Sequence, residues 1–298
     1  MADFSDGTNL QNIDKRIRRI FIADPGYKLC NVDLEQADAR NIGAMVWNLF
    51  PDLMAEKRLN YLDAAEGGDL HTTVARMTWQ ELPWKDDPRA NREIADQPFY
   101  REKTYRDLAK TLGHGTNFNG QPPQMSKHSK TDQQLIVDFQ SRYFGAFPEL
   151  KRRIEWVGNE ILAKGYIVTL FGRRRYFLRR RDDNKTLNEG AAFEPQSMTA
   201  EEINYAMLKV FRLRLRFPKL QMLLQVHDSL LLQYPEEYEQ AGVVDAIKEA
   251  FRTTLILRAG RQFFVPCEVQ VGWNWGYFGK ENPNGMSKWK GEDTRRRA

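Results

Sequence analysis

Two aspartates, Asp33 and Asp228, stand beside short apolar runs in distant parts of the chain. Asp33 follows the run 29–32, and Asp228 lies between the runs 220–226 and 230–234. If these runs are neighbouring strands, the two carboxylates could hold a pair of divalent cations about 3.5–4 Å apart, the arrangement that serves nucleotidyl transfer. Mg²⁺ suits such hard oxygen ligands. Each acid also has a simpler explanation, a helix cap for Asp33 and turn geometry for Asp228.

A second candidate group has helical spacing. Arg106, Lys110 and His114 are four residues apart, so a helix over this segment presents them on one side. The lysine and the arginine could bind a triphosphate, one as a point charge and the other as a planar fork. A hydrated basic stripe without a ligand explains the same spacing. Gly113 and Gly115 weaken the helix but permit a ligand to approach closely.

The segment 173–181 combines arginine with apolar and aromatic residues. Arg173, Arg174 and Arg175 precede Tyr-Phe-Leu at 176–178, and three more arginines follow at 179–181. A solvated surface hairpin has this composition, and so does a groove that follows a nucleic-acid backbone. The aromatic residues favour the groove, because bases stack on them.

These residues need strands and helices to position them. Periodicity predicts a strand at 27–33, helices at 38–50, 99–112, 131–143, 150–164, 201–215 and 243–257, strand-turn-strand segments at 166–178 and 220–234, and a closing strand at 265–271. The segment 79–98, rich in Pro, Trp and charge, is predicted to be a loop or an insertion. The expected class is α+β: antiparallel strands that carry the acids, with a mostly helical block inserted between them.

Composition limits the alternatives. The chain has 298 residues, 41% of them hydrophobic, and a net charge of +5, which allows a large core and a polyanionic partner. With only Cys30 and Cys267 there is no disulfide framework and no CxxC metal site. The four histidines lack the spacing of a zinc-binding helix. No signal peptide or membrane span is evident, so a cytoplasmic location without a membrane partner is expected.

Taken in order, these segments resemble the polymerase half of family A DNA polymerases, the bacterial DNA polymerase I type. The resemblance covers nearly the whole chain and has seven parts: Asn9-Leu10-Gln11-Asn12-Ile13; motif A at Asp33-Leu34-Glu35-Gln36-Ala37-Asp38-Ala39-Arg40; Gly68-Asp69-Leu70-His71; motif B from Arg106 to Lys110; Thr169-Leu170-Phe171-Gly172-Arg173-Arg174-Arg175; Pro195-Gln196-Ser197; and motif C at Gln225-Val226-His227-Asp228-Ser229.

The resemblance implies a domain plan. Residues 1–65 and 166–279 would form the palm, an antiparallel sheet with flanking helices, and residues 66–165 an inserted, mostly helical fingers subdomain. Residues 280–298 would be a mobile polar tail. The thumb and the exonuclease of the family are absent from this sequence.

The resemblance also implies residue roles. The two Mg²⁺ ions, for which Mn²⁺ can substitute, would be held by Asp33, Asp228 and the carbonyl of Leu34. The incoming dNTP would contact Arg106, Lys110, His71, His114, Phe118, Asp38 and Gln36, with Lys110 as the proton donor to the leaving pyrophosphate. The DNA primer-template would contact Gln196, His227, Arg40, Arg173, Arg174 and Arg175.

Several positions depart from the family pattern. Motif C ends in Ser229 where the family has Glu, and Asp38 replaces the Glu that excludes the sugar 2′-hydroxyl. His114 stands where the family has Phe or Tyr, and Phe118 where it has Tyr. Near Gln196 the frame is ambiguous, because a second alignment makes Ser197 the matching residue.

The expected function is template-directed DNA synthesis by two-metal transfer from a dNTP to a primer 3′-hydroxyl. Because the thumb and exonuclease would lie upstream of Met1, we expect a split polymerase of phage type, in the host cytoplasm, whose thumb and 3′–5′ exonuclease belong to a separate polypeptide. A shortened piece of a longer protein is the alternative. The competing functions are a non-catalytic, palm-like nucleic-acid-binding subunit and a single-subunit RNA polymerase.

Overall fold

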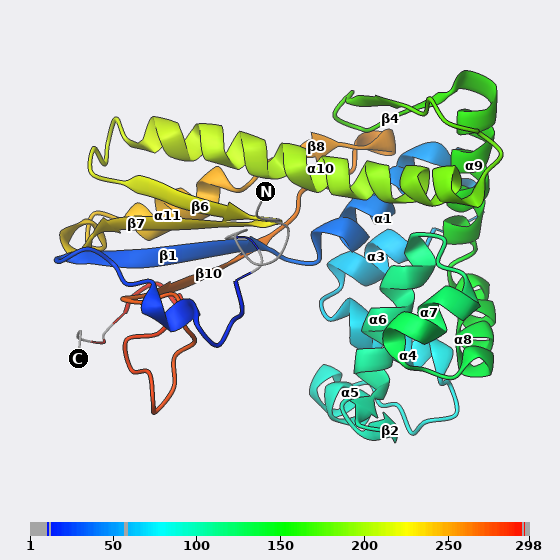
Figure 1. Cartoon of the computed structure of the whole chain (residues 1–298), viewed down its shortest axis with the longest axis horizontal. Helices are drawn as coiled ribbons and strands as arrows, with labels where there is room; N and C mark the ends of the chain where they lie inside the picture. The colour runs from blue at the N-terminus through cyan, green and yellow to red at the C-terminus, as the bar shows by residue number, and fades with distance from the viewer. Residues whose placement is uncertain (1–10, 12, 57–58, 294, 296–298) are drawn as a thin grey trace, which may run out of the picture. The chain divides into compact units, whose positions relative to one another are not determined.

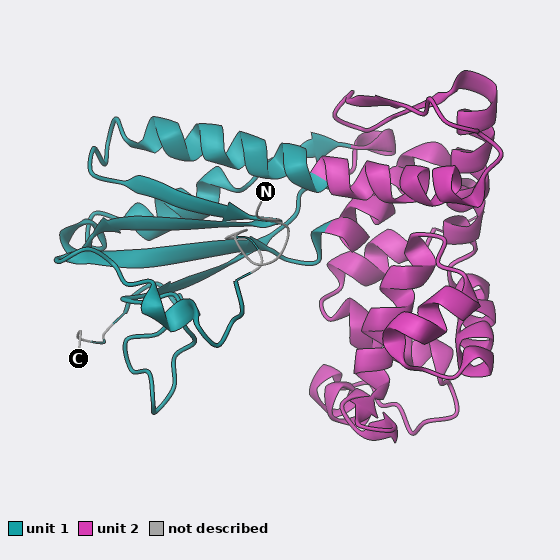
Figure 2. Cartoon of the chain, viewed as in Figure 1, with its two compact units in different colours: residues 1–37, 199–256, 262–298 teal, residues 38–198, 257–261 magenta. Residues whose placement is uncertain are grey.

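The computed structural model of the chain describes residues 11, 13–56, 59–293 and 295. The chain divides into two compact units, shown in separate colours in Figure 2. Unit 1 comprises Met1–Ala37, Thr199–Ile256 and Gln262–Ala298, and unit 2 comprises Asp38–Met198 and Leu257–Arg261. Helix α10 contributes to both units, since it runs from Asn184 to Leu213.

Unit 1 is built on a five-stranded antiparallel sheet in the order β11-β10-β1-β7-β6 (Figure 1). Its strands are β1 (Tyr27–Leu34), β6 (Gln221–Val226), β7 (Ser229–Pro235), β10 (Cys267–Gly272) and β11 (Ser287–Lys288). The central strand β1 buries Leu29, Cys30 and Val32, which explains its nearly continuous apolar sequence, and Asp33 is its exposed residue. The predicted α+β class with an antiparallel sheet is confirmed.

The remaining elements of unit 1 are short, apart from the C-terminal half of α10. They are the 3-10 turns Arg18–Ile20 and Glu236–Tyr238, helix α11 (Val243–Ala250), and strands β8 (Leu255–Ile256) and β9 (Gln262–Phe263). The helix predicted at 243–257 therefore ends early. The β-branched pair Thr253-Thr254 leads the chain into β8, which pairs with β9.

The segment after Gly279 packs on unit 1 over residues 280–293, where the sequence predicts a mobile tail. It adds β11 to the edge of the sheet and carries Asp293, whose side chain is 5% exposed. The carboxylate of Asp293 forms an ion pair with the ammonium group of the buried Lys28, at 3.2 Å between Oδ2 and Nζ. A buried ammonium group is costly without a carboxylate, so this pair ties the segment to β1.

Unit 2 is mostly helical. It contains α1 (Ala37–Leu49), α2 (Pro51–Ala55), α3 (Tyr61–Glu66), α4 (Leu70–Thr78), α5 (Pro88–Ala95), α6 (Tyr105–Asn117), α7 (Pro122–Ser129), α8 (Gln133–Ala146), α9 (Pro148–Lys164), the first half of α10, the hairpins β2 (Pro98–Tyr100) with β3 (Lys103–Thr104) and β4 (Tyr166–Val168) with β5 (Arg174–Tyr176), and the 3-10 turn Arg258–Gly260. Among the described residues, no helix is long and apolar enough to cross a membrane.

Helices α2, α3, α4 and α7 were not predicted, and three further segments of unit 2 differ from the sequence-based expectations. The segment 79–98 is not all loop, because Asp87 caps α5 and Pro88 starts it. The helix expected from residue 99 begins at Tyr105, after a hairpin, since Thr104 and Asp107 form a capping box. Helix α10 starts 17 residues before the predicted position 201, at Asn184, and continues through Pro195.

A buried ion pair joins three helices of unit 2. Arg153 of α9 is 1% exposed and pairs with Glu194 of α10 at 3.2 Å. Its guanidinium also donates to the carbonyl oxygens of Asn117 at 3.2 Å and Ala191 at 2.7 Å. The C-terminal end of α6 is therefore fixed to α9 and α10 by one side chain.

Candidate active site

The sheet of unit 1 brings Asp33 and Asp228 together. Asp33 lies opposite Ser229 in the register of β1 and β7, and the backbone N–H of Leu34 donates to the carbonyl of Asp228 at 3.0 Å. The two carboxyl groups are close enough for Asp228 to affect the ionisation of Asp33. Asp33 thus lies on β1, and Asp228 lies in the turn directly before the neighbouring strand β7.

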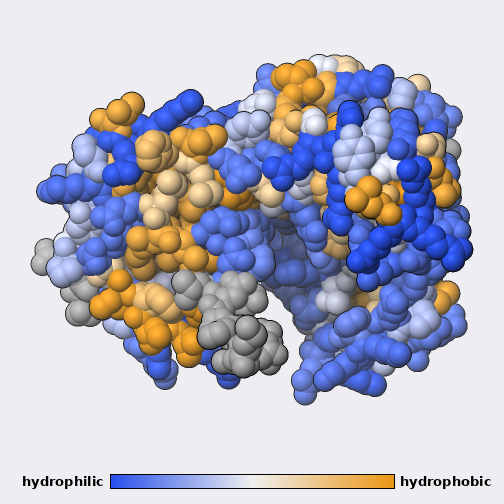
Figure 3. Space-filling model, turned by 45° about the horizontal axis from the view of Figure 1, so that its top comes forward, coloured by the Kyte–Doolittle hydropathy of each residue, from blue (hydrophilic) through white to orange (hydrophobic). Residues whose placement is uncertain are grey.

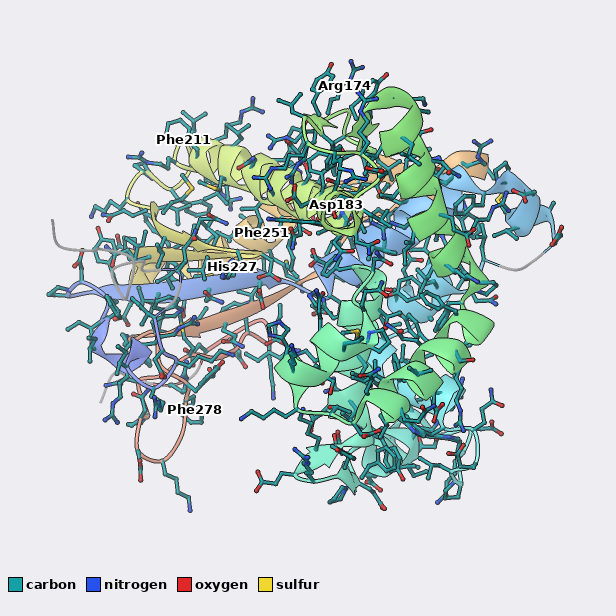
Figure 4. All side chains as sticks on the ribbon, turned by 45° about the vertical axis from the view of Figure 1, so that its right-hand side comes forward. Arg174, Asp183, Phe211, His227, Phe251 and Phe278 are labelled. Atoms are coloured by element: carbon teal, nitrogen blue, oxygen red, sulfur yellow. The ribbon has the colours of Figure 1, made fainter. Side chains whose placement is uncertain are left out.

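A two-residue turn holds Asp228 in place. Val226 and Ser229 are paired residues of β6 and β7, so His227 and Asp228 alone make the connection. His227 has a φ of 52°, a left-handed conformation that non-glycine residues seldom adopt. The Ser229 hydroxyl donates to the carbonyl of Val226 at 2.9 Å. Figure 4 labels His227 at this turn, where its side chain is exposed.

The pair of carboxyl groups disfavours ionisation of Asp33. The protein atoms around it, followed by the charge and the hydrogen bond of Asp228, raise the pKa of Asp33 to about 7. Glu268, which lies opposite Asp33 on β10, acts in the same sense. Two acids this close repel when both are charged, and a bound cation relieves that repulsion.

The donor set fits divalent cations that retain water. No group of three or more His, Cys, Asp or Glu side chains with metal-binding geometry occurs among the described residues. Glu268 is engaged elsewhere, since it accepts from Lys288 at 2.7 Å and Gln270 at 2.8 Å. Two carboxylates plus the carbonyl oxygen of Leu34 suit Mg²⁺, which completes its shell with water and phosphate oxygens.

The predicted basic face lies on α6 of unit 2. Lys110 and His114 are exposed, as the helical spacing requires. Arg106 is instead held by Asp69, with Nε donating to Oδ2 at 2.8 Å and Nη2 to Oδ1 at 3.1 Å. The guanidinium group of Arg106 is thus already bound to a carboxylate in this structure, which the sequence did not predict.

Asp69 is a residue whose role the sequence did not reveal. It caps α4 by accepting from the backbone N–H groups of His71 and Thr72, and it also pairs with Arg92 at 2.8 Å. Burial works against its charge, but hydrogen bonds from Arg106 and Thr72 and the charge of Arg106 outweigh this effect and hold the pKa of Asp69 well below its usual range. The N-cap position was a readable signal, whereas the contact with Arg106 depends on the packing of α4 against α6.

The protein surroundings of two histidines of unit 2 disfavour their charged forms. Burial, followed by the nearby Arg106, lowers the pKa of His71 to about 4. The surrounding protein atoms also lower the pKa of His114, although Asp38 acts against them. The ring of His114 packs edge-on against Phe118 at 4.5 Å between centroids. Asp38, His114 and Phe118, predicted to contact the nucleotide sugar, therefore lie close together.

The remaining predicted site residues have different environments. Gln36 adopts a φ of 55° just after β1. Arg40 is only 6% exposed, which does not suit the predicted DNA contact. Gln196 is exposed and Ser197 is 7% exposed, so the structure favours Gln196 as the residue that can reach a ligand.

The first part of the arginine-rich segment belongs to the hairpin in which β5 (Arg174–Tyr176) pairs with β4 (Tyr166–Val168). Arg173, Arg174 and Arg175 are all exposed, and Arg174 lies over the ring of Tyr166 at 4.4 Å (labelled in Figure 4). Arg175 pairs with Glu189 at 3.1 Å. The hairpin thus combines accessible cations with aromatic faces, as a nucleic-acid contact requires.

Replacing Asp69 by asparagine is expected to lower the free energy of unfolding of unit 2 by about 2 kcal/mol at pH 7, through a weaker cap and lost charged hydrogen bonds. Because the pKa of Asp69 is lowered by folding, its contribution is complete above the unfolded value near 4 and is lost as the pH falls below it. Urea unfolding of wild type and Asp69→Asn between pH 3 and 7 measures this contribution to the free energy of unfolding. Asp87→Asn, at the exposed cap of α5, is the matched control and should lose less.

Comparison with known proteins decides the family. The sequence model of DNA polymerase family A matches residues 4–277. The chain belongs to DNA polymerase family A. Among family members it is 32% identical over 279 residues to the thermostable DNA polymerase I of Thermus thermophilus and 33% identical over 280 residues to that of Thermus aquaticus. Each alignment covers 90% of this chain and 30% of the relative.

A solved structure of the family shares the fold. The POL domain of Pol1 from M. smegmatis, in complex with DNA primer-template and dNTP, superimposes with a TM-score of 0.70 at 22% identity. The match covers 90% of this chain and 44% of that one. This family A chain therefore has the fold of a polymerase domain, and it spans under a third of the length of the curated relatives described above.

Proposed function

We propose that this chain catalyses template-directed DNA synthesis, with Asp33 and Asp228 as the residues that hold two Mg²⁺ ions. The observation that carries the proposal is the pairing of these carboxyl groups at the end of β1 and at the turn before β7. Membership in family A and the order of its motifs support the same function.

The metal ions, when bound, would activate the primer 3′-hydroxyl and neutralise charge on the phosphates. Asp33, Asp228 and the carbonyl oxygen of Leu34 would position them. Mn²⁺ can substitute, because it takes the same oxygen ligands. A backbone hydrogen bond from Leu34 to the carbonyl of Asp228 fixes the main chain that carries both aspartates, so little backbone reorganisation is needed when the ions bind.

The exposed face of α6 would bind the triphosphate. Lys110 supplies a mobile positive charge, and Arg106 can add a second one once it exchanges Asp69 for phosphate oxygens. His71 would donate a hydrogen bond to the outer phosphates as a neutral imidazole. Asp38, His114 and Phe118, with Gln36, would contact the base and sugar.

Lys110→Ala is expected to slow the single-turnover rate of nucleotide addition by about a hundred-fold, because the lysine would protonate the leaving pyrophosphate. Lys110→Arg keeps the charge without a readily transferable proton, so it should restore dNTP affinity but not the rate. Rapid-quench kinetics separate the two effects. Lys127→Ala, at an exposed position of α7, is the control, and an unchanged rate in Lys110→Ala excludes the proton-donor role.

DNA contacts would come from Gln196, His227 and the exposed hairpin that carries Arg173, Arg174 and Arg175. Backbone contacts supply most of the affinity for DNA, and the family's thumb provides many of them. We therefore propose a separate polypeptide with thumb and 3′–5′ exonuclease as partner, as in a phage-type split polymerase in the host cytoplasm. Co-purification from the native source tests this: processive synthesis by this chain alone contradicts it.

Primer extension tests the proposed function. The purified chain, at concentrations above those of the DNA, is given a primer-template, Mg²⁺ and either deoxynucleotides or ribonucleotides. Template-dependent addition of deoxynucleotides that stops with a chelator is the expected result. Preferential ribonucleotide addition would indicate an RNA polymerase, and DNA binding without extension would indicate a non-catalytic subunit.

A further inference from the structure

An exposed apolar stripe lies along the C-terminal half of α10, within unit 1. Tyr205, Leu208 and Phe211 are 43%, 59% and 57% exposed, and Leu215 in the following turn is 91% exposed. Their spacing of three and four residues puts them on one side of the helix. The opposite side is buried, with Ile203, Ala206 and Val210 each at most 1% exposed. Figure 4 labels Phe211 on this part of α10. We call the four residues the α10 stripe.

Cations border the stripe at its C-terminal end. Arg212, Arg214, Arg216 and Lys219 are all exposed. Arg214 lies over the ring of Phe211 at 5.6 Å, and Arg216 donates to the carbonyl of Ala241 at 2.9 Å. No ion pair with a described acidic residue involves any of these four side chains. In Figure 3, orange hydrophobic residues lie among blue hydrophilic ones on the face that this view shows.

Three kinds of occupant could cover such a surface. Tyr205 and Phe211 have ring faces, but Arg214 already lies over the ring of Phe211. Leu208 and Leu215 are aliphatic and offer no face on which a base can stack, so the stripe favours a protein over nucleic acid. A symmetric second copy would bring the same patch, with its Arg212 and Arg214, against itself, and like charges would repel. A protein segment with apolar side chains flanked by Asp and Glu satisfies both the stripe and the cations.

We propose that the α10 stripe is a docking surface for such an acidic, amphipathic protein segment. The eleven residues from Tyr205 to Leu215 span about 15 Å, the length of a three-turn helix whose apolar residues recur at i, i+3 or i+4, and i+7. The stripe supplies the apolar contact, and Arg212, Arg214, Arg216 and Lys219 set the charge preference. This inference does not depend on polymerase activity.

The probe is a fluorescein-labelled helical peptide with leucines at this spacing and glutamates beside them. A matched peptide carries lysine in place of each glutamate. Fluorescence anisotropy should show that wild type binds the glutamate peptide, more weakly at higher salt, and prefers it to the lysine peptide. Leu208→Asp with Phe211→Asp should lower the affinity at least about tenfold. Leu178→Asp, at a position of unit 2 that is 94% exposed, should leave it unchanged.

A charge-reversal variant keeps the test decisive if the apolar variant folds poorly. Arg212→Glu with Arg214→Glu should bind the lysine peptide in preference to the glutamate peptide. The proposal fails if this variant keeps the original preference, or if the folded stripe variant binds the glutamate peptide like wild type. It also fails if the stripe substitutions instead abolish binding of single-stranded DNA or of neutral phosphatidylcholine vesicles, or convert a dimer of wild type into a monomer.

Discussion

Asp228→Asn is expected to reduce the single-turnover rate of nucleotide addition by about a thousand-fold while leaving the fold intact. Asparagine has nearly the same size as aspartate but lacks the negative charge that would hold a divalent cation. Loss of about 4 kcal/mol of transition-state stabilisation corresponds to this factor. The turn itself should persist, because its hydrogen bonds involve the backbone of Leu34 and the Ser229 hydroxyl.

Glu268→Gln is the matched control for Asp228→Asn. Glu268 lies opposite Asp33 in the sheet, but Lys288 and Gln270 already occupy its carboxylate. Its neutralisation should change the rate by less than about tenfold. Single-turnover extension at saturating Mg²⁺ compares the two variants, and equal losses would mean that local charge, rather than a specific ligand, determines the rate.

Arg153→Met is expected to have the largest effect on stability, about 3 kcal/mol of unfolding free energy in unit 2. The substitution removes the partner of the buried Glu194 and leaves the carbonyl oxygens of Asn117 and Ala191 without their donor. Full burial raises the pKa of Glu194 to about 7 even with Arg153 beside it, so this carboxyl group has little capacity to remain charged alone. Urea unfolding followed by far-UV circular dichroism measures the loss.

The neighbouring Arg152→Met provides the comparison. Arg152 pairs with Asp52 at the surface, where side chains are 43% and 52% exposed, so its loss should stay below about 1 kcal/mol. Combining Arg153→Met with Glu194→Leu should recover part of the stability, since the unpaired carboxyl group is removed while the carbonyl oxygens of Asn117 and Ala191 still lack their donor. Equal losses in Arg152→Met and Arg153→Met would show that the buried pair contributes nothing specific.

Local sequence signals predicted the elements that carry the candidate site. The apolar run before Asp33 and the run after Asp228 are strands because the centre of a sheet buries both faces, and the run before His227 pairs with the second of them as an edge strand. Helical spacing likewise placed Lys110 and His114 on the exposed side of α6. These features depend on periods of two or 3.6 residues, which a sequence displays directly.

Other features depend on contacts between distant segments and could not be read in this way. Glu268 opposes Asp33 only because β10 pairs with β1 in one particular register. Arg106 donates hydrogen bonds to Asp69, which is 37 residues away in sequence, because α4 packs beside α6. The family resemblance implied a DNA contact for Arg40, yet this residue is buried. Helix boundaries differ from the predicted ones where a capping residue starts the helix inside a periodic segment, as Thr104 does before α6.

The two-residue connection between β6 and β7 limits where this chain tolerates changes in length. Side chains alternate between the faces of a strand, so one residue inserted at His227 or Asp228 would turn the carboxylate away from Asp33 or shift the pairing of Val226 with Ser229. The exposed residues Lys280 and Glu281, just before the bridge at Asn282, carry no such constraint. A peptide label can therefore be inserted genetically at this position. Insertions or deletions in the β6–β7 turn should abolish the incorporation of nucleotides.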